Sequence, residues 1–523
     1  MPDGDWAASL AELRDAGFAD KEAIAERLIA SGHPAARPVL TAMLEDRLFA
    51  RIDTRDVVMA KAVGEEMTSL ELVDPVTLKD AGSTAPDTLE KIGTNNRLRR
   101  FLRTTLARYG LASGDAAVRL DAVKEMSRSL DDATLQTLRE HRADERDERV
   151  AYEIETSLAL AAVESTDASE RLAAVRVLSD RLRPEVRNRL AALVEPGPDG
   201  AIPETDAQVR AAAEAAISSI DGWRRLYSAI ETLFFGLSLG SVLVLVAIGL
   251  AITFGVMGVI NMAHGELMML GAYTTYVVQL AMPDQIGASI LVAIPAAFLV
   301  AAAVGIAIER AIIRFLYGRP LETLLATFGV SLMLQQLVRS VFSANNRSVT
   351  TPAWLSGTLQ VNDALGFTLN RMYIILFTLI VFAILLAALR YTRLGLYIRA
   401  VSQNRPMARA MGVRGEWVDA MTFGLGSGIA GVAGVALSQL TNVGPNLGQS
   451  YIIDSFMVVV FGGVGNLWGT LISGMSLGIV NKLLEPYAGA VLGKILVLVA
   501  LILFIQRRPR GLFPQTGRAA EAA

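Results

Sequence analysis

The chain has no cysteine and only three histidines, His33, His141 and His264, among its 523 residues. Without cysteine it can form neither disulfide bridges nor cysteine-ligated metal sites. The histidines are too few and too far apart in the sequence to indicate a metal cluster, so no bound metal is expected. The first residues, MPDGDWAASLAEL, also lack the basic and apolar regions of a signal peptide.

Nucleotide-binding motifs are missing as well. The segment Gly489–Ile495 superficially resembles a phosphate loop, but it is one intervening residue short, and Ile495 stands where Ser or Thr must meet magnesium. The glycines between Gly424 and Gly428 lack a surrounding strand–helix–strand pattern, which excludes a dinucleotide site. Basic residues are paired with acids or confined to loop ends, so no nucleic-acid partner is expected. The chain therefore has no motor of its own.

Hydrophobic residues make up 52% of the chain and are unevenly distributed. Residues 1–222 are rich in Arg, Asp and Glu, as in a soluble domain. Residues 228–506 carry few charges and several apolar runs near 20 residues, which are long enough to cross a ~30 Å hydrocarbon layer. We predict an all-α protein with a soluble helical domain at 1–222, a polytopic membrane domain at 223–510 and a short tail at 511–523.

The soluble half contains similar segments with an Asp or Ser that can cap a helix, then an arginine, then a small apolar face. Their arginines, Arg119, Arg171 and Arg210, stand 52 and 39 residues apart. An irregular period near 40 is typical of paired-helix solenoids of the HEAT type, and an unrelated helical bundle is the alternative. The segments Val73–Asn96 and Pro196–Pro203 interrupt this pattern, and the first predicts a loop or short strands between two helical lobes.

The membrane half is predicted to contain seven full spans and one broken apolar stretch. The spans cover residues 229–253, 265–282, 286–309, 321–343, 371–391, 417–440 and 487–506. The broken stretch covers 452–484 and is interrupted by Gly462, Gly463, Gly465 and Asn466. Arginines gather in the loops 310–319 and 390–414 and after residue 506, which indicates that these three places face the cytoplasm.

Counting spans from these loops orients the chain. Three spans precede the 310–319 loop, so the helical domain is expected in the periplasm, which requires a leader ahead of it. A cytoplasmic C-terminus requires that residues 453–461 dip halfway into the membrane and that 467–484 return. Discontinuous helices at membrane depth are tolerated only where they line a cavity or are buried in protein, so the break at 462–466 is a candidate for the translocation path.

The segment between the first two spans carries polar groups at or near membrane depth. Asn261, His264 and Glu266 lie within GVMGVINMAHGELMMLGAY. An ionisable group at this depth is costly and indicates a functional site. Alternatively, Glu266 only stabilises the start of a helix, because an acid in the first turn faces the positive end of the helix dipole. The two interpretations are compatible.

A polar, basic stretch, Gly395–Gly412, separates two long apolar segments. Asn404 can cap a short helix and Gly412 can end it. This helix would present Met407 and Met411 within an apolar knob flanked by arginines. One interpretation is that the stretch takes force from a soluble motor, and the other is an ordinary basic interfacial loop.

Three blocks, at 236–273, 395–414 and 458–474, resemble the permease subunits of ABC importers of the branched-chain amino-acid type (LivH-like), in the order of that family. The long helical domain, Asn95–Arg100 and Ile453–Phe456 resemble the urea-importing (UrtB-like) branch. The resemblance implies a second permease subunit, two cytoplasmic ATP-binding subunits, a periplasmic substrate-binding protein and the lipid of a bacterial inner membrane. It implies a transport subunit that is not an enzyme and has no cofactor, since ATP is bound by its partners.

On this resemblance the chain is a urea permease; a permease for branched-chain amino acids or short amides is the alternative, and a passive channel or membrane-anchored scaffold is more remote. Urea is neutral, so its path needs hydrogen-bonding groups without a strong fixed charge. Glu266 and Asp454 are expected to be structural or gating residues. The candidate path residues are Asn261, His264, Glu266, Thr327, Ser331, Asn442, Asp454 and Ser455. The resemblance places ATPase coupling on Arg399, Gln403, Asn404, Arg405, Met407, Arg409, Met411 and Gly412.

Overall fold

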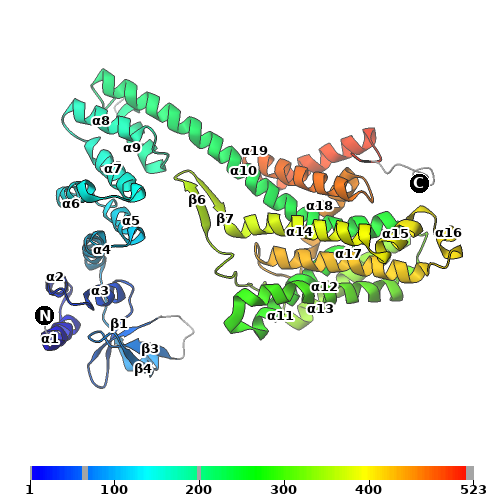
Figure 1. The fold of residues 1–523 in the computed structure, drawn as a ribbon, viewed down its shortest axis with the longest axis horizontal. Coiled ribbons are helices and arrows are strands. Elements are labelled where there is room, and N and C mark those ends of the chain that lie inside the picture. Colours follow the sequence, from blue (N-terminus) through cyan, green and yellow to red (C-terminus); the bar gives the residue numbers. More distant parts are fainter. Residues whose placement is uncertain (1–2, 62–68, 197–201, 514–523) are drawn as a thin grey trace. The chain divides into compact units, whose positions relative to one another are not determined.

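A computed structural model describes residues 3–61, 69–196 and 202–513 (Figure 1). The connector at 196–203 and the tail at 511–523 therefore lie largely outside the described residues. The chain divides into two compact units, Met1–Gly222 and Trp223–Ala523, which are treated separately below. Both units are mostly helical, which confirms the predicted fold class.

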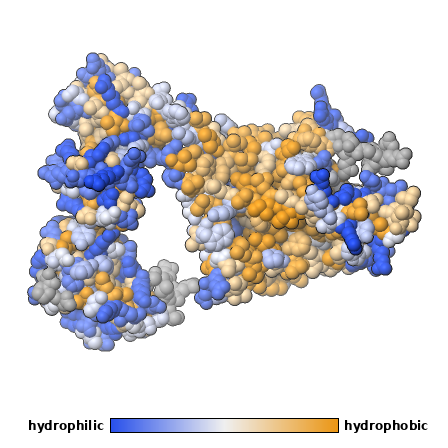
Figure 2. Space-filling view, viewed as in Figure 1, coloured by the Kyte–Doolittle hydropathy of each residue, from blue (hydrophilic) through white to orange (hydrophobic). Residues whose placement is uncertain are grey.

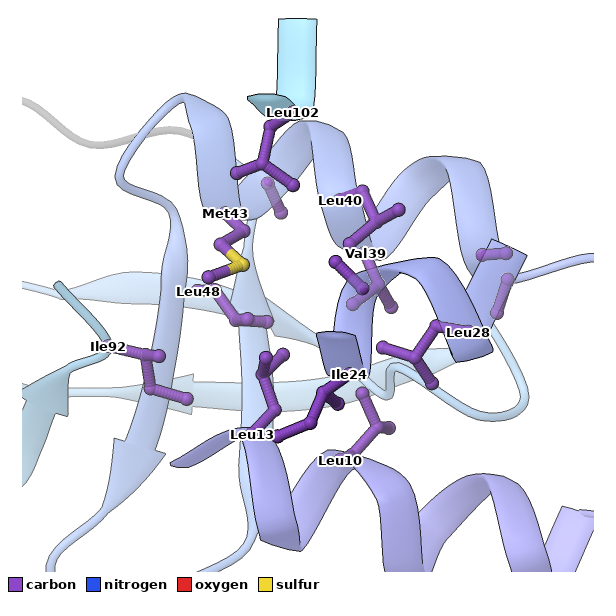
Figure 3. Packing of buried hydrophobic residues seen from close by; sticks show 14 of the residues in the cluster. Leu10, Leu13, Ile24, Leu28, Val39, Leu40, Met43, Leu48, Ile92 and Leu102 are labelled. Atoms are coloured by element: carbon purple, nitrogen blue, oxygen red, sulfur yellow. The ribbon is translucent and has the colours of Figure 1, made fainter. Parts of the chain in front are cut away.

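The first unit begins with three helices packed on a small antiparallel sheet. The helices are α1 (Asp3–Asp15), α2 (Phe18–Ala30) and α3 (Ala36–Leu44), and the strands are β1 (Leu48–Arg51), β2 (Val57–Ala60), β3 (Leu70–Val73), β4 (Asp80–Thr84) and β5 (Leu89–Lys91). The described strands pair in the order β4-β3-β2-β1-β5, with Leu48 opposite Met59. Figure 3 shows Leu13, Ile24 and Leu48 converging in the core between helices and sheet.

A run of helices follows the sheet, and most of them begin at an aspartate. They are α4 (Asn96–Leu111), α5 (Ala116–Met126), α6 (Asp132–Asp144), α7 (Glu148–Ala162), α8 (Ala168–Leu178), α9 (Pro184–Val194) and α10 (Ala207–Met257). The carboxylates of Asp115, Asp131, Asp147 and Asp167 accept hydrogen bonds from backbone N–H groups of the first turn that follows. These caps satisfy N–H groups that have no partner inside the helix.

Two of the three repeated segments share one hydrogen-bonded arrangement, which we call the Arg–Glu clasp. Arg119 donates two hydrogen bonds of 2.8 Å to Glu145 and one of 2.9 Å to the carbonyl of Ser113. Arg171 repeats this with Glu204, at 2.8 Å twice, and with the carbonyl of Ser165, at 2.9 Å. The repeat is therefore three helices long, α5–α7 and then α8 to the start of α10.

The third segment of the sequence pattern, around Arg210, is not a further copy of this repeat. The backbone N–H of Asp206 donates to Glu204, and that of Asp147 donates to Glu145, both at 2.8 Å. The start of α10 thus corresponds to the start of α7, which follows the glutamate of the first clasp. Similar capping sequences at both kinds of helix start explain why the sequence suggested an irregular period.

The clasp makes the first unit sensitive to acid. The hydrogen bonds from Arg119 lower the pKa of Glu145 from 4.5 to about 2. The stabilisation from ionised Glu145 is therefore complete well above pH 4.5 and is lost as the pH falls toward 2. We expect Glu145→Gln to destabilise the unit by about 2 kcal/mol at pH 7, because a buried charged hydrogen-bond pair is broken.

Thermal unfolding of the full chain between pH 7 and pH 3, compared with the wild type, measures this effect. The difference between Glu145→Gln and the wild type should shrink as the pH falls. Glu26→Gln, at an exposed position of α2, is the matched control and should unfold like the wild type throughout. An equal difference at pH 7 and pH 3 would contradict the role given to the Glu145 charge.

In the second unit, six described helices are long and apolar enough to cross a membrane. They are α10, α12 (Ile286–Ala311), α13 (Pro320–Phe342), α14 (Leu369–Tyr391), α17 (Gly415–Ser438) and α19 (Leu467–Arg507). The sequence predicted seven, because it counted 265–282. That segment is α11 (His264–Ala281), which has 18 residues and starts deep inside the bundle, as described below. The element α19 consists of two helices that meet at a kink at Gly489, whose φ is 74° and which lies near the start of the span predicted at 487–506.

The helix break at 462–466 is present, but it lies at an end of the bundle and not halfway along a span. The helix α18 (Leu447–Gly462) has 16 residues, about 24 Å of helix. At its end, the backbone N–H groups of Leu512 and Phe513 donate to the carbonyls of Phe461 and Gly462, at 2.9 and 3.2 Å. The break is thus covered by the segment that follows the last helix. The sequence predicted that residues 453–461 reach only halfway into the membrane. They are instead the last part of α18, which continues to the end of the bundle.

The second unit has two distinguishable ends. At the first, which we call the α16 end, lie α15 (Arg393–Gln403), α16 (Arg405–Ala410), the end of α10 and the 463–466 loop, since Val256 packs near Ile398 and Gly255 approaches Gly465. At the other, the hairpin end, lie β6 (Thr358–Asn362) and β7 (Leu365–Thr368). Figure 2 shows a broad hydrophobic surface over the helices, with hydrophilic side chains gathered where Figure 1 places α15 and α16.

Candidate functional site

A non-helical segment enters the bundle between α10 and α11. The helix α10 ends at Met257, Gly258 has a φ of 65°, and α11 begins only at His264. The Nε2 atom of His264 lies 3.0 Å from the carbonyl oxygen of Val246, roughly three helical turns before the end of α10. The helix α11 therefore starts deep inside the bundle, where irregular backbone persists only if it is buried or lines a cavity.

The side chain of Glu266 is held in the first turn of α11. The residue is 1% exposed, and its Oε1 atom accepts hydrogen bonds from Ser331 Oγ at 3.1 Å and from Gln335 Nε2 at 2.8 Å. Its Oε2 atom has no hydrogen-bond partner among the described residues. The positive end of the α11 dipole favours a carboxylate at this position. Glu266 thus lies at a helix start and presents an unpaired polar atom among the described residues, and its role in a functional site stays a prediction.

Two further predicted path residues surround the same segment. Asn261 accepts a hydrogen bond from the backbone N–H of Ala263 at 3.0 Å, and its Nδ2 atom is buried without a partner in the described part of the chain. Thr327 accepts one from the backbone N–H of Met262 at 3.1 Å. The structure thus brings Asn261, His264, Glu266, Thr327 and Ser331 into one region. We call this set, together with Gln335, the Glu266 group.

Gln335 is the member that the sequence reasoning missed. It lies four residues after Ser331 on α13, which places both side chains on one face of the helix. A glutamine that lies one helical turn after a predicted path residue, in an otherwise apolar span, could therefore have been predicted as a further path residue. Recognising it required knowing that this face of α13 meets α11.

The start of α18 lies next to the start of α11. A Cβ atom on Gly265 would come within 2.4 Å of the carbonyl oxygen of Gly448, so the two backbones touch. Close to this contact in the sequence, Asn446, the residue just before α18, accepts a hydrogen bond of 2.7 Å from Arg339 through its side-chain oxygen. Two helix N-termini that meet inside a bundle offer N–H groups and partial positive charge to a polar solute.

The remaining path candidates are not part of this group. Asp454 accepts a hydrogen bond of 2.8 Å from Lys494 on α19, and Ser455 donates to the carbonyl of Tyr451 at 2.8 Å. Asn442 is exposed beyond the end of α17, at the hairpin end, where its neighbour Val443 bridges to Arg347. Hydroxyl and amide groups along an apolar sequence do not reveal which of them point toward a common space.

The segment 393–412 forms two short helices at the α16 end. The side chain of Asn404 caps α16 by accepting from the N–H of Met407 at 3.0 Å, and Gly412 leaves it with a φ of 88°. Met407 and Met411 are 60% and 79% exposed. We keep the name apolar knob for these two side chains. Gln403 ends α15, and Arg399 donates to the carbonyl of Leu389.

The arginines that were expected to flank the knob differ in their surroundings. Arg405 donates two hydrogen bonds to Asp419, the fifth residue of α17, at 2.6 and 3.0 Å. Arg409 lies against Gly415, where an added Cβ would be 3.0 Å from its Nε atom. Arg405 is therefore bound within its own chain, whereas Met407, Arg409 and Met411 are exposed.

The bundle of membrane-spanning helices with buried polar groups defines a multi-pass membrane permease. Residues 232–505 match the family described as branched-chain amino acid transport system, permease component, and the chain belongs to that family. No solved structure matches the chain.

The relatives are permeases by name. The chain is 30% identical to the high-affinity branched-chain amino acid transport system permease protein LivH of Salmonella typhimurium over 294 residues, 54% of this chain and 94% of LivH. It is 31% identical to BraD of Pseudomonas aeruginosa, a permease of the same description, over 298 residues, 55% of this chain and 96% of BraD. It is 30% identical to the ribose import permease protein RbsC of Escherichia coli K12 over 263 residues, 48% of this chain and 77% of RbsC.

Proposed function

We propose that this chain is the permease subunit of an ATP-driven importer for a small solute rich in N–H groups. The observation that carries the proposal is the Glu266 group, a cluster of buried polar groups with the unpaired acceptor Glu266 Oε2, beside two helix N-termini in a chain of the permease family. Urea is the first candidate, supported by the resemblance of the long helical domain and of Ile453–Phe456 to urea permeases. A branched-chain amino acid is the second, supported by the similarity to LivH and BraD.

The partners follow from the same proposal. A second permease subunit completes the path, two cytoplasmic ATP-binding subunits dock at the α16 end, and a periplasmic substrate-binding protein delivers the solute. The arginines around α15 and α16 and those after residue 506 support a cytoplasmic position for the α16 end and the C-terminus, under a bacterial inner membrane. By the number of crossings, the first unit then lies in the periplasm.

The substitution Glu266→Gln separates the two candidate solutes. Glutamine keeps the shape and one acceptor oxygen but removes the charge. Uptake of neutral urea should fall only a few-fold, whereas an amino acid whose ammonium group faces Glu266 should lose a charge-assisted pair worth about 3 kcal/mol, or roughly 100-fold. Uptake of labelled urea and labelled leucine into proteoliposomes, with the full set of partners and ATP, measures both.

Asp454→Asn is the control, because Asp454 is paired with Lys494 outside the Glu266 group. It should not change the preference between the two solutes. Unchanged transport of both solutes by Glu266→Gln would remove Glu266 from the mechanism. Equal uptake with and without ATP would instead indicate a passive channel and overturn the importer proposal itself.

A further inference from the structure

The helix α16 is fixed to the bundle by a pair of opposite charges at its first residue. Arg405 donates from both terminal nitrogens to the two carboxylate oxygens of Asp419, which is 1% exposed. Two parallel hydrogen bonds between a guanidinium and a carboxylate fix orientation as well as distance. The exposed knob and the partly buried arginine therefore lie on one short helix but serve different contacts.

A second contact extends the pair to α12. The guanidinium of Arg405 lies 5.2 Å from the ring centroid of Tyr317, and the hydroxyl of Tyr317 donates to Glu309 at 3.2 Å. Burial, followed by the nearby carboxylates of Asp419 and Glu309, raises the pKa of Tyr317, so that the hydroxyl keeps its proton. Glu309 is in the last turn of α12. We call Arg405, Asp419, Tyr317 and Glu309 the arginine anchor.

The two helices held by the arginine anchor touch along their length. A Cβ atom on Gly305 of α12 would lie 2.1 Å from Ser427 Oγ of α17. One on Gly431 of α17 would lie 2.5 Å from the carbonyl oxygen of Ala297. Glycines that bring backbones this close leave little room for sliding, so α12 and α17 are expected to move as one body.

The same body reaches the Glu266 group. A Cβ atom on Gly434 of α17 would lie 2.0 Å from the carbonyl oxygen of Met268, which is two residues after Glu266 on α11. A displacement of α16 thus has a continuous packed route, through the arginine anchor and α17, to the start of α11. Packing alone does not prove that energy is coupled along the route, so the coupling must be measured.

We infer that the arginine anchor transmits the movement of α16 into α17 and α12, which makes Arg405 and Asp419 positioning residues for transport. This inference rests on the proposed function, since it is the ATP-binding subunit that would displace α16. The knob binds that subunit and the anchor passes its movement on. Loss of the anchor should therefore uncouple ATP hydrolysis from uptake and leave the subunits bound.

The test uses the full chain assembled with its partner permease, ATP-binding subunits and binding protein in proteoliposomes. Three quantities are measured: co-purification of the ATP-binding subunits, ATP hydrolysis, and solute taken up per ATP. Asp419→Asn should leave the first two near wild type and lower uptake per ATP by about tenfold, because one charge-assisted contact is lost. Glu416→Gln, which removes a largely exposed acid three residues earlier on α17 and with it only a 3.9 Å surface contact to Arg310, is the matched control and should change none of them.

A charge exchange tests the contact directly. Arg405→Asp combined with Asp419→Arg should recover much of the uptake per ATP that either single change loses. If Asp419→Asn does not assemble, Tyr317→Phe removes only the hydrogen bond to Glu309 and should lower uptake per ATP in the same direction by a smaller factor. Uptake per ATP equal to wild type in whichever of these two variants assembles overturns the inference, and so does a loss of uptake that only follows loss of the ATP-binding subunits. Absence of ATP-dependent uptake in the wild type would instead refute the proposed function.

Discussion

Replacing both knob residues in a Met407→Glu/Met411→Glu variant should abolish ATP-driven uptake. Both side chains are exposed in the described chain and contribute nothing to its core, so the variant should fold normally. Burial of each methionine against a partner is worth about 1.5–3 kcal/mol, and two buried carboxylates would oppose docking further. We expect at least about a 100-fold loss of affinity for the ATP-binding subunits, measured by co-purification and titration of ATP hydrolysis.

The matched control places the same charge at the other end of the unit. Leu359 is an exposed apolar residue of β6, and Leu359→Glu should leave binding and hydrolysis unchanged. A double-glutamate variant that still binds the ATP-binding subunits at wild-type strength would show that α16 is not their docking site. The ATP-binding subunits would then have to act on the arginine anchor through another part of the chain.

Gly434→Val should be among the most destabilising single changes in the membrane unit. The added side chain would meet the carbonyl oxygen of Met268 at 2.0 Å and the backbone nitrogen of Ala272 at 2.7 Å. Neither atom belongs to a flexible side chain, so the helices must separate. We expect a loss of about 3 kcal/mol or more, seen as low yield and a lowered unfolding temperature in detergent.

Gly329 provides the comparison, since an added Cβ there meets nothing within 4 Å. Gly329→Val lies on the exposed face of α13 and should unfold close to the wild-type temperature. Similar stability of the two variants would mean that α11 and α17 are not in backbone contact.

Features that depend on a short stretch of chain were predictable from the sequence. The apolar run at 371–391 corresponds to α14, Leu369–Tyr391, because the length and hydropathy of a span belong to its own residues. Asn404 as a cap and Gly412 as a helix end follow local backbone rules in the same way. The four-residue strands β1 to β3 were missed, because runs this short do not separate strand from helix.

Features that depend on contacts between residues far apart in the sequence were not predictable. The arginine anchor joins residues from three helices and one loop, and nothing in the sequence shows that Arg405 meets Asp419. The depth at which α11 starts depends on the contact of His264 with Val246, on a different helix. The α18–α19 break was placed halfway along a span, because the backbone partners at Leu512 and Phe513 lie about 50 residues away.

The contact between those last residues and the end of α18 has a consequence for synthesis of the chain. A chain stopped at Arg507 would contain every membrane helix, yet the carbonyls of Phe461 and Gly462 would lack their N–H partners. Because a ribosome makes Leu512 and Phe513 after all the helices, the turn between α18 and α19 is completed only when translation has passed them. Prematurely terminated chains would therefore carry an unfinished turn at the α16 end of the bundle.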